Sequence, residues 1–239
     1  MRIWWASLFS VSLIYADVNL FLYETTANAP FPEAPVPEGP WLTGPLLTPS
    51  PSIVPTGHFN FEPYLFINNT YGLYNNHWQL QRFPQTASNI NLQAFTQIGL
   101  NSWMDLSILP QFFYSYVGDE SRWRFGDLLM GLDFQLTRGR HSEKVPSVKF
   151  TINELFPTGS YQHLKDYALG TDSAGGGTFA TTFQFTFGYH WRLSESRYLY
   201  YLATRWSAGV TLFTPVSVHG LNAYGGDDTT SGRVLHGTT

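Results

Sequence analysis

The 239-residue sequence contains no cysteine and few charged residues. Without cysteine the chain forms no disulfide framework and offers no thiolate for a metal site or for nucleophilic catalysis. Charged residues make up 13% of the chain, against about 25% in ordinary soluble domains, so part of its surface need not face water. The net charge is −4 and lysine and arginine form no run, so the basic surface of a nucleic-acid-binding protein is missing. We expect no nucleic acid partner.

The sequence also lacks any later apolar run of the roughly 20 residues that a membrane-spanning helix requires. Residues 1–16 combine one basic residue, a mostly apolar stretch from Ile3 to Ile14 and the small residue Ala16. This pattern predicts a secretory signal peptide at 1–16, and therefore export. A buried N-terminal helix or an uncleaved anchor is the alternative.

Proline is concentrated in one stretch of the chain. Nine of the fifteen prolines lie between Pro30 and Pro55, and this density favours an extended chain without strand pairing. We therefore expect residues 17–57 to be a Pro-rich periplasmic linker ahead of the folded part. Its GPWLTGPLLTPSPS segment also contains Trp41 and several leucines. The segment is either a plain spacer, which we favour, or a plug that packs against the folded part.

Alternation of apolar and polar residues dominates the rest of the chain. From Phe179 to Leu193 every second residue is aromatic or apolar, apart from Thr181, and the intervening residues are polar or small. A period of two places these two sets on opposite faces of a β-strand. The same pattern predicts seven antiparallel strands, near residues 58–71, 88–100, 103–116, 125–137, 146–156, 178–193 and 198–213.

One face of the predicted strands collects nearly all of their charges. The candidate lumen-lining residues on this face are Glu62, Asp105, Asp127, Asp133, Lys149, Arg192, Arg205, Phe95 and Phe113. Charged residues in a lumen either line a water path or form an ion-paired plug. The two phenylalanines either stack on an aromatic solute or fill the lumen. Because the signs of the charges nearly balance, we expect no strong ion selectivity.

Alternation alone does not tell which face meets lipid, because a soluble sandwich alternates as well. Soluble strands usually have about five or six residues, whereas most of the predicted strands are longer. Aromatic residues also gather toward the ends of the apolar face, where an interfacial girdle lies. We therefore predict an all-β fold, an antiparallel transmembrane β-barrel of the outer-membrane type, formed by about seven strands in residues 58–213.

Several segments resemble a known family. In chain order they are GPLLTPS, FGDLLMGLDFQL from Phe125 to Leu136, ELFPTGSY from Glu154 to Tyr161, and FGYHW after Thr186. Over residues 40–226 the chain resembles the Gram-negative outer-membrane β-barrel proteins of the meta-pathway of phenol degradation type, which are assigned as transporters. The resemblance implies a barrel that moves small, often aromatic or hydrophobic, molecules. It carries over no catalytic residues.

The predicted number of strands is odd, which is unexpected for such a barrel. Single-chain bacterial barrels have an even number of strands, from about eight upward. Residues 214–239 lack alternation and a terminal aromatic strand. We therefore expect a loop or an aberrant C-terminal tail at 214–239, and an incomplete barrel truncated by a frameshift near Gly226. The alternative is a weakly periodic strand hidden in residues 72–86.

No segment predicts catalysis, a cofactor or a metal site. The loop from Gly170 to Gly177 resembles a nucleophile loop of serine hydrolases, but it does not match G-x-S-x-G and no helix is predicted after it. With His163, Asp166 and Asp172 nearby, a hydrolase at the barrel rim is a disfavoured alternative. The seven histidines are scattered, and none pairs at metal-ligand spacing with a third ligand.

We therefore expect an outer-membrane protein, not an enzyme, that acts as a passive transporter or channel for small aromatic or hydrophobic molecules. Its expected partners are the lipid bilayer with its lipopolysaccharide, the outer-membrane assembly machinery and an unknown small-molecule solute. Two further alternatives stay open. One is a structural or adhesive surface barrel whose loops 72–87 and 157–177 bind a partner, and the other is a truncated product without function.

Overall fold

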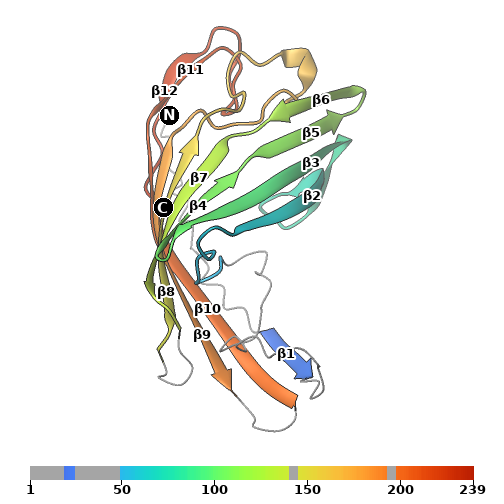
Figure 1. The fold of residues 1–239 in the computed structure, drawn as a ribbon. Helices are drawn as coiled ribbons and strands as arrows, with labels where there is room; N and C mark the ends of the chain where they lie inside the picture. Colours follow the sequence, from blue (N-terminus) through green and yellow to red (C-terminus); the bar gives the residue numbers. More distant parts are fainter. Residues whose placement is uncertain (1–18, 25–48, 140–144, 193–197) are drawn as a thin grey trace.

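The computed structural model describes residues 19–24, 49–139, 145–192 and 198–239, and for 19–24, 192 and 198–201 it describes the backbone alone. In these residues the fold is all-β and antiparallel, as predicted, with one ten-stranded sheet and a separate two-stranded hairpin (Figure 1). No helix in the described part has the length and apolar character needed to cross a membrane. The predicted signal peptide, 1–16, and linker residues 25–48 lie outside the described residues.

The large sheet runs in the order β1-β10-β9-β8-β7-β4-β3-β5-β6, with β2 paired to β3. β11 and β12 form the separate hairpin, and a 3-10 turn, η1 (Asp166–Ala168), lies in the loop before β9. The strands are β1 (Asn19–Glu24), β2 (Phe59–Tyr74), β3 (Leu80–Asn101), β4 (Met104–Leu109), β5 (Gln111–Val117), β6 (Glu120–Phe125), β7 (Leu128–Thr137), β8 (Ser147–Phe156), β9 (Ala180–Arg192), β10 (Tyr198–Phe213), β11 (Val216–His219) and β12 (Ser231–Val234).

Two of the long strands are each divided in two. β4 pairs with the second half of β3 and β5 with its first half. The division between β4 and β5 lies at Pro110, because proline has no N–H to donate to a strand ladder. β6 and β7 are likewise parts of one strand, interrupted at Gly126 and Asp127. With these pairs joined, each of the seven predicted ranges overlaps one long strand of an antiparallel meander.

The structure differs from the sequence prediction in four segments. Residues 120–124, predicted to connect two strands, belong to β6. Residues 72–87, predicted as a long loop, belong mostly to β2 and β3, which extend into a hairpin with its turn at 75–79. The register shifts between Thr70 and Gly72, so the extension breaks the alternation by which the strands were predicted. The strand residues in 72–86 therefore extend β2 and β3 and form no additional strand. β1 lies in the predicted linker, and β11 and β12 lie in the predicted tail.

The polarity of the sheet is inverted relative to a soluble protein. Along β8 the buried side chains are Ser147, Lys149 and Thr151, and the other strands continue this polar, buried face with Ser88, Asn91, Gln97, Asp105, Ser107, Ser115, Asp133, Thr186 and Arg205. We call this the inner face. Exposed on the opposite, outer face are Phe59, Phe61, Leu65, Ile67, Leu92, Ile98, Phe112, Leu132, Phe185, Phe187, Trp206, Val210 and Leu212.

Aromatic pairs join neighbouring strands on the outer face. Phe150 in β8 and Phe185 in β9 are register partners with ring centroids 4.9 Å apart. Tyr114 in β5 and Trp123 in β6 are also partners, at 4.8 Å. Each such cross-strand pair contributes roughly 0.2–1 kcal/mol. The exposed rings therefore stabilise the pairing of the strands while remaining accessible from outside.

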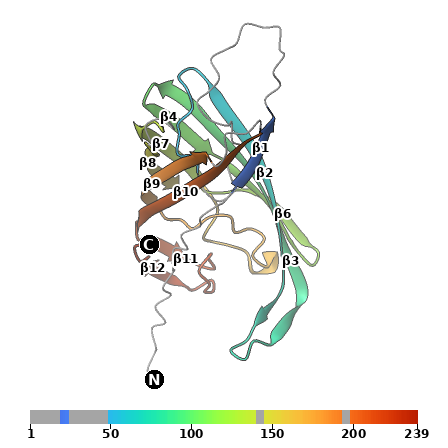
Figure 2. The same cartoon turned by 90° about the horizontal axis from the view of Figure 1, so that it is seen from below.

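The sheet curls around its inner face without closing on itself (Figure 2). In the described residues β2 pairs only with β3, and β1 pairs only with β10. On the same side of β10, beyond the stretch that pairs with β1, Thr211 and Thr239 exchange backbone hydrogen bonds. The bond from the Thr211 N–H to the Thr239 carbonyl oxygen measures 2.7 Å. The fold thus leaves the far edges of β1 and β2 open.

Candidate functional site

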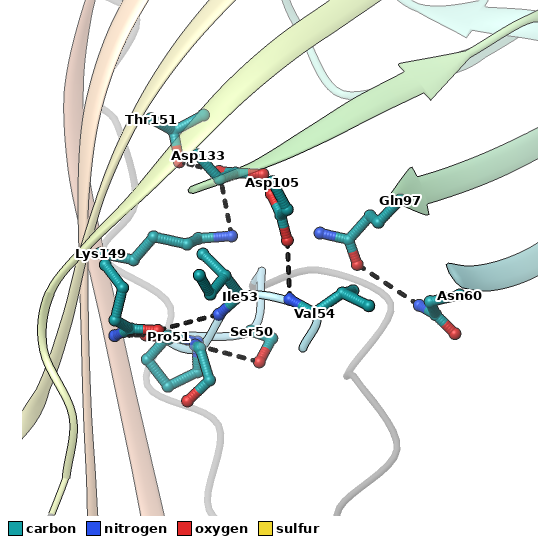
Figure 3. A network of polar contacts seen from close by, with 12 residues as sticks. Ser50, Pro51, Ile53, Val54, Asn60, Gln97, Asp105, Asp133, Lys149 and Thr151 are labelled. Atoms are coloured by element: carbon teal, nitrogen blue, oxygen red, sulfur yellow. Dashed lines mark hydrogen bonds and ion pairs between the residues drawn. The ribbon is translucent and has the colours of Figure 1, made fainter. Parts of the chain in front are cut away.

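Charged side chains from three strands meet at the centre of the inner face. Asp105 in β4 and Asp133 in β7 are direct cross-strand partners. The Lys149 ammonium lies 3.1 Å from Asp133 Oδ1, and the Thr151 hydroxyl donates to the same oxygen (Figure 3). All four side chains are buried. Because removing charges from water costs several kcal/mol per ion, this group depends on its internal pairing. The structure thus brings together three of the predicted lumen residues.

The Asp105 carboxylate also binds a segment from outside the sheet. Its Oδ2 accepts a 2.8 Å hydrogen bond from the backbone N–H of Val54, whereas Oδ1 has no hydrogen-bond partner. The adjacent Ile53 donates its N–H to Oε1 of Gln135 in β7 at 2.9 Å. Two consecutive backbone donors of this segment are therefore bound by side chains rather than by a neighbouring strand (Figure 3).

Residues 49–57, which we call the plug, lie against the inner face. The Pro51 carbonyl accepts hydrogen bonds from Gln135 Nε2 at 3.0 Å and from the Ser147 hydroxyl at 2.8 Å. The hydroxyls of Ser52 and Ser147 are 3.2 Å apart. Pro51 and Ile53 are buried. Of the two roles left open for the Pro-rich segment, the structure gives these residues the less favoured one, packing against the folded part.

Two glycines make room for the plug. A Cβ on Gly188 in β9 would lie 2.3 Å from Cγ of the Pro51 ring, and one on Gly99 in β3 would lie 2.1 Å from the Pro55 carbonyl oxygen. Both distances are far below van der Waals contact, and ring and backbone atoms do not swing aside as the end of a long side chain does. Glycine inside a strand often marks such a close approach of another backbone.

A small cavity remains between the plug and the sheet. Its apolar wall contains Phe95 from β3, Leu109 from β4 and Leu129 from β7. Hydroxyl, amide and charged groups complete it. The lining residues are Pro49, Phe95, Ser107, Leu109, Leu129, Asp133, Lys149, Thr151, Asn153 and Gln184. Four of the ten lining residues are apolar and six carry hydroxyl, amide or charged groups, so the cavity offers both kinds of contact.

The other predicted lumen residues lie apart from this cavity. The ring of Phe113 covers Gly126, whose added Cβ would meet it at 2.4 Å. Arg205 is buried in β10, and the side chain of Arg192 lies outside the described residues. Glu62, on β2, accepts hydrogen bonds from side chains on its own strand. These donors are Asn60 Nδ2, at 2.7 Å, and the Tyr64 hydroxyl.

Asp127, also predicted to line the lumen, binds two parts of the loop before β9. It lies at the break between β6 and β7. Its Oδ1 accepts from the N–H of Gly159 at 2.9 Å and its Oδ2 from the N–H of Gly176 at 2.8 Å. One buried carboxylate therefore holds both ends of the loop 157–179, which lies at one end of the sheet (Figure 1). We call this end the rim.

The segment between β11 and β12 closes over the same loop. The Tyr224 hydroxyl donates to the Gly176 carbonyl at 2.5 Å and lies 3.0 Å from His236 Nε2. Burial raises the pKa of the Tyr224 phenol, and the nearby Asp127 and Tyr161 act in the same direction. The phenol therefore stays protonated, as donation to a carbonyl requires.

The residues considered for a hydrolase have structural contacts within the rim. Asp172 Oδ2 accepts from the backbone N–H of Lys165 at 2.8 Å. The ring of His163 stacks on that of His219, with centroids 6.3 Å apart. Asp166 begins the turn η1. These contacts give each of the three residues a structural role in the rim, while the buried Oδ1 of Asp172 has no hydrogen-bond partner among the described residues.

Sequence reasoning missed the residues that bind the plug, namely Gln135, Ser147, Gly99 and Gly188. Glycine inside a strand pattern is the one local signal for such a contact, because it often marks the close approach of another backbone. No model of a known protein family matches this chain, and no curated protein sequence matches it. Its function must therefore be inferred from a polar inner face, a small cavity and a segment seated beside it.

Proposed function

We propose that this chain forms a β-barrel in the outer membrane and serves as a passive conduit for small molecules. The observation that carries the proposal is the inverted polarity of the sheet, with charges buried on the inner face and large apolar side chains exposed on the outer face. A contiguous apolar surface of this extent is unfavourable in water and favourable in lipid. Strands of 10 to 22 residues, such as β7 and β3, suit a tilted bilayer crossing.

In this proposal β1 closes the barrel. Directions alternate along the meander, so β2 and β10 run parallel, and β1, antiparallel to β10, runs opposite to β2. β1 therefore has the direction that antiparallel pairing with β2 requires. With each divided strand counted once, β1 brings the meander to an even number of strands, as in bacterial barrels. Closure would satisfy both open edges, which lipid cannot do.

The solute in this proposal is small and partly apolar. A barrel of about eight strands has an interior that side chains fill or that holds one small ligand. The cavity beside the plug offers Phe95, Leu109 and Leu129 together with the polar groups of Asn153 and Gln184. The resemblance of the sequence to transporters of aromatic and hydrophobic molecules supports the same class of solute.

A charge on the outer face tests the membrane assignment. Leu132, in the middle of β7, is 38% exposed, and Leu132→Lys would cost about 2–4 kcal/mol if that face meets lipid. The matched control is Leu235→Lys, at a position 73% exposed outside the sheet. Unfolding in lipid vesicles should show the loss for Leu132→Lys alone. Equal, small effects of both variants would mean that the outer face meets water.

Two further measurements test the barrel and the conduit separately. Protein from an outer-membrane fraction should change its gel mobility on boiling, because closed barrels keep their fold in detergent until heated. Conductance in potassium chloride across planar bilayers should then rise above that of protein-free membranes. A mobility shift without conductance would favour the structural or adhesive barrel, whose partners are lipid, lipopolysaccharide and another surface. If boiling does not change the gel mobility, the barrel itself is wrong.

A further inference from the structure

The central part of the plug, residues 51–54, makes no backbone hydrogen bond to a strand in the described part of the chain. Its two central N–H groups, from Ile53 and Val54, are bound by side chains of Gln135 and Asp105. Its Pro51 carbonyl is likewise bound by side chains. Because neighbouring strands are held by backbone-to-backbone hydrogen bonds, the central part of the plug could leave the inner face without breaking any hydrogen bond of the sheet.

The inner face is nevertheless shaped to receive this segment. Asp105, Gln135 and Ser147, which bind its backbone, come from β4, β7 and β8, and the two glycines that clear space for it come from β3 and β9. The plug therefore contacts five strands of the meander. An extended segment whose central part is seated so specifically, yet held there only by side chains, is suited to reversible docking.

One end of the plug is fixed and contains a flexible joint. The N–H of Gly57 donates to the Gly99 carbonyl and the N–H of Gly99 donates to the His58 carbonyl, each at 3.0 Å. Gly57 has a φ of +74° with no heavy atom within 4 Å of an added Cβ. Glycine adopts this conformation and its alternatives without steric cost. The backbone can therefore turn at Gly57 at the cost of one hydrogen bond, from its own N–H to Gly99, while the bond from the Gly99 N–H to the His58 carbonyl keeps β2 in place.

We propose that the plug is a gate of the conduit, seated in the closed state and released by rotation about Gly57. Release exposes the cavity that Pro49 helps to enclose and frees the inner-face groups that now bind the plug backbone. This inference rests on the proposed conduit function, and its tests are chosen so that the two fail in different ways.

The first test locks the plug. The chain contains no cysteine, and the hydroxyls of Ser52 and Ser147 are 3.2 Å apart, so Ser52→Cys with Ser147→Cys should form a disulfide on mild oxidation. We expect the oxidised protein to conduct potassium chloride no better than protein-free bilayers. Reduction should raise conductance to the wild-type level or above it, because Ser147→Cys also removes the hydroxyl that donates to the Pro51 carbonyl. Each single cysteine variant is a control for oxidation itself.

The second test weakens the seat. Gln135→Ala removes two hydrogen bonds to the plug, and Gly188→Ala introduces a methyl group where the Pro51 ring lies. Each variant should raise the fraction of molecules with a released plug by roughly tenfold. A change of this size corresponds to the loss of about one net hydrogen bond. The matched controls are Gln93→Ala, whose amide donates to Gln111, and Gly232→Ala, which meets nothing within 4 Å. Both controls should conduct as the wild type does.

The possible outcomes separate the gate from the conduit. Conductance that is equal in the oxidised and reduced double-cysteine protein would overturn the gate and leave the conduit standing. Failure of the two cysteines to join, in protein that still shows the heat-dependent mobility shift, would also overturn the seated plug. If the wild type and the weakened-seat variants all fold and none conducts, the conduit itself is wrong. Should Gly188→Ala fail to fold, Gln135→Ala gives the same comparison without added volume.

Discussion

Asp105, at the centre of the inner face, and Asp127, at the rim, are both buried carboxylates that bind backbone N–H groups of segments outside the sheet. Asp127 uses both oxygens, one for Gly159 and one for Gly176. Asp105 uses one oxygen for Val54 and leaves the other without a hydrogen-bond partner, opposite the charge of Asp133. The same chemical group therefore meets two different environments.

This difference separates a fixed attachment from a weaker one. Hydrogen bonds from backbone N–H groups to a charged carboxylate are strong, and two of them satisfy Asp127. The central carboxylates instead depend on Lys149, which lies against Asp133. Stability at the centre should therefore respond mainly to the cation, and stability at the rim to the carboxylate.

The largest effect should come from Lys149→Met. This variant leaves the buried Asp133 without its counter-ion and beside Asp105, so we expect a loss of about 3–5 kcal/mol in the free energy of unfolding. Urea unfolding in lipid vesicles, followed by tryptophan fluorescence, measures it. Adding Asp133→Asn to Lys149→Met should recover much of the loss. A loss below about 1 kcal/mol, the range of exposed ion pairs, would contradict the buried pairing.

Asp127→Ala should have the second largest effect, and it should be local. The loop 157–179 loses two charge-assisted hydrogen bonds, while the pairing of β6 and β7 with their neighbours is untouched. The cost therefore falls on closing the loop and less on unfolding of the sheet. Limited proteolysis of the folded protein should then cut this loop far faster than in the wild type. Asp228→Ala, at an exposed position near the rim, serves as the control. If Asp127→Ala leaves the rate of cleavage unchanged, Asp127 does not hold the loop 157–179 in place.

The strands of this fold could be predicted from sequence. The hydrogen bonds by which Asp105 holds the plug and Asp127 holds the loop 157–179 could not. Alternation with a period of two is a local signal, and it located every long strand of the meander and the sorting of charge onto one register. It failed at 72–87, where a register shift near Gly72 breaks the period. The side-chain hydrogen bonds between the plug and the sheet link residues 51 to 96 positions apart. No local pattern records which distant side chain accepts a particular backbone N–H.

Asp105→Asn should change stability much less than either variant above. The asparagine side-chain oxygen can still accept from the Val54 N–H, and the substitution removes one of two like charges that face each other across β4 and β7. We expect the free energy of unfolding to change by less than about 1 kcal/mol, because the retained hydrogen bond and the relieved repulsion oppose the lost charge. A loss as large as that of Lys149→Met would show that Asp105, too, needs its full charge.

The smallest effect should come from Tyr224 and should depend on pH. Because the pKa of this phenol is raised above its ordinary value of 10.0 in the folded protein, its contribution is complete below that value and is lost as the pH rises through the raised pKa. The phenolate cannot donate to the Gly176 carbonyl, a contact worth at most about 1 kcal/mol. Cleavage of the loop 157–179 by an alkaline protease should therefore accelerate more in the wild type than in Tyr224→Phe as the solution becomes strongly basic. Parallel acceleration in both proteins would mean that Asp127 alone holds the rim.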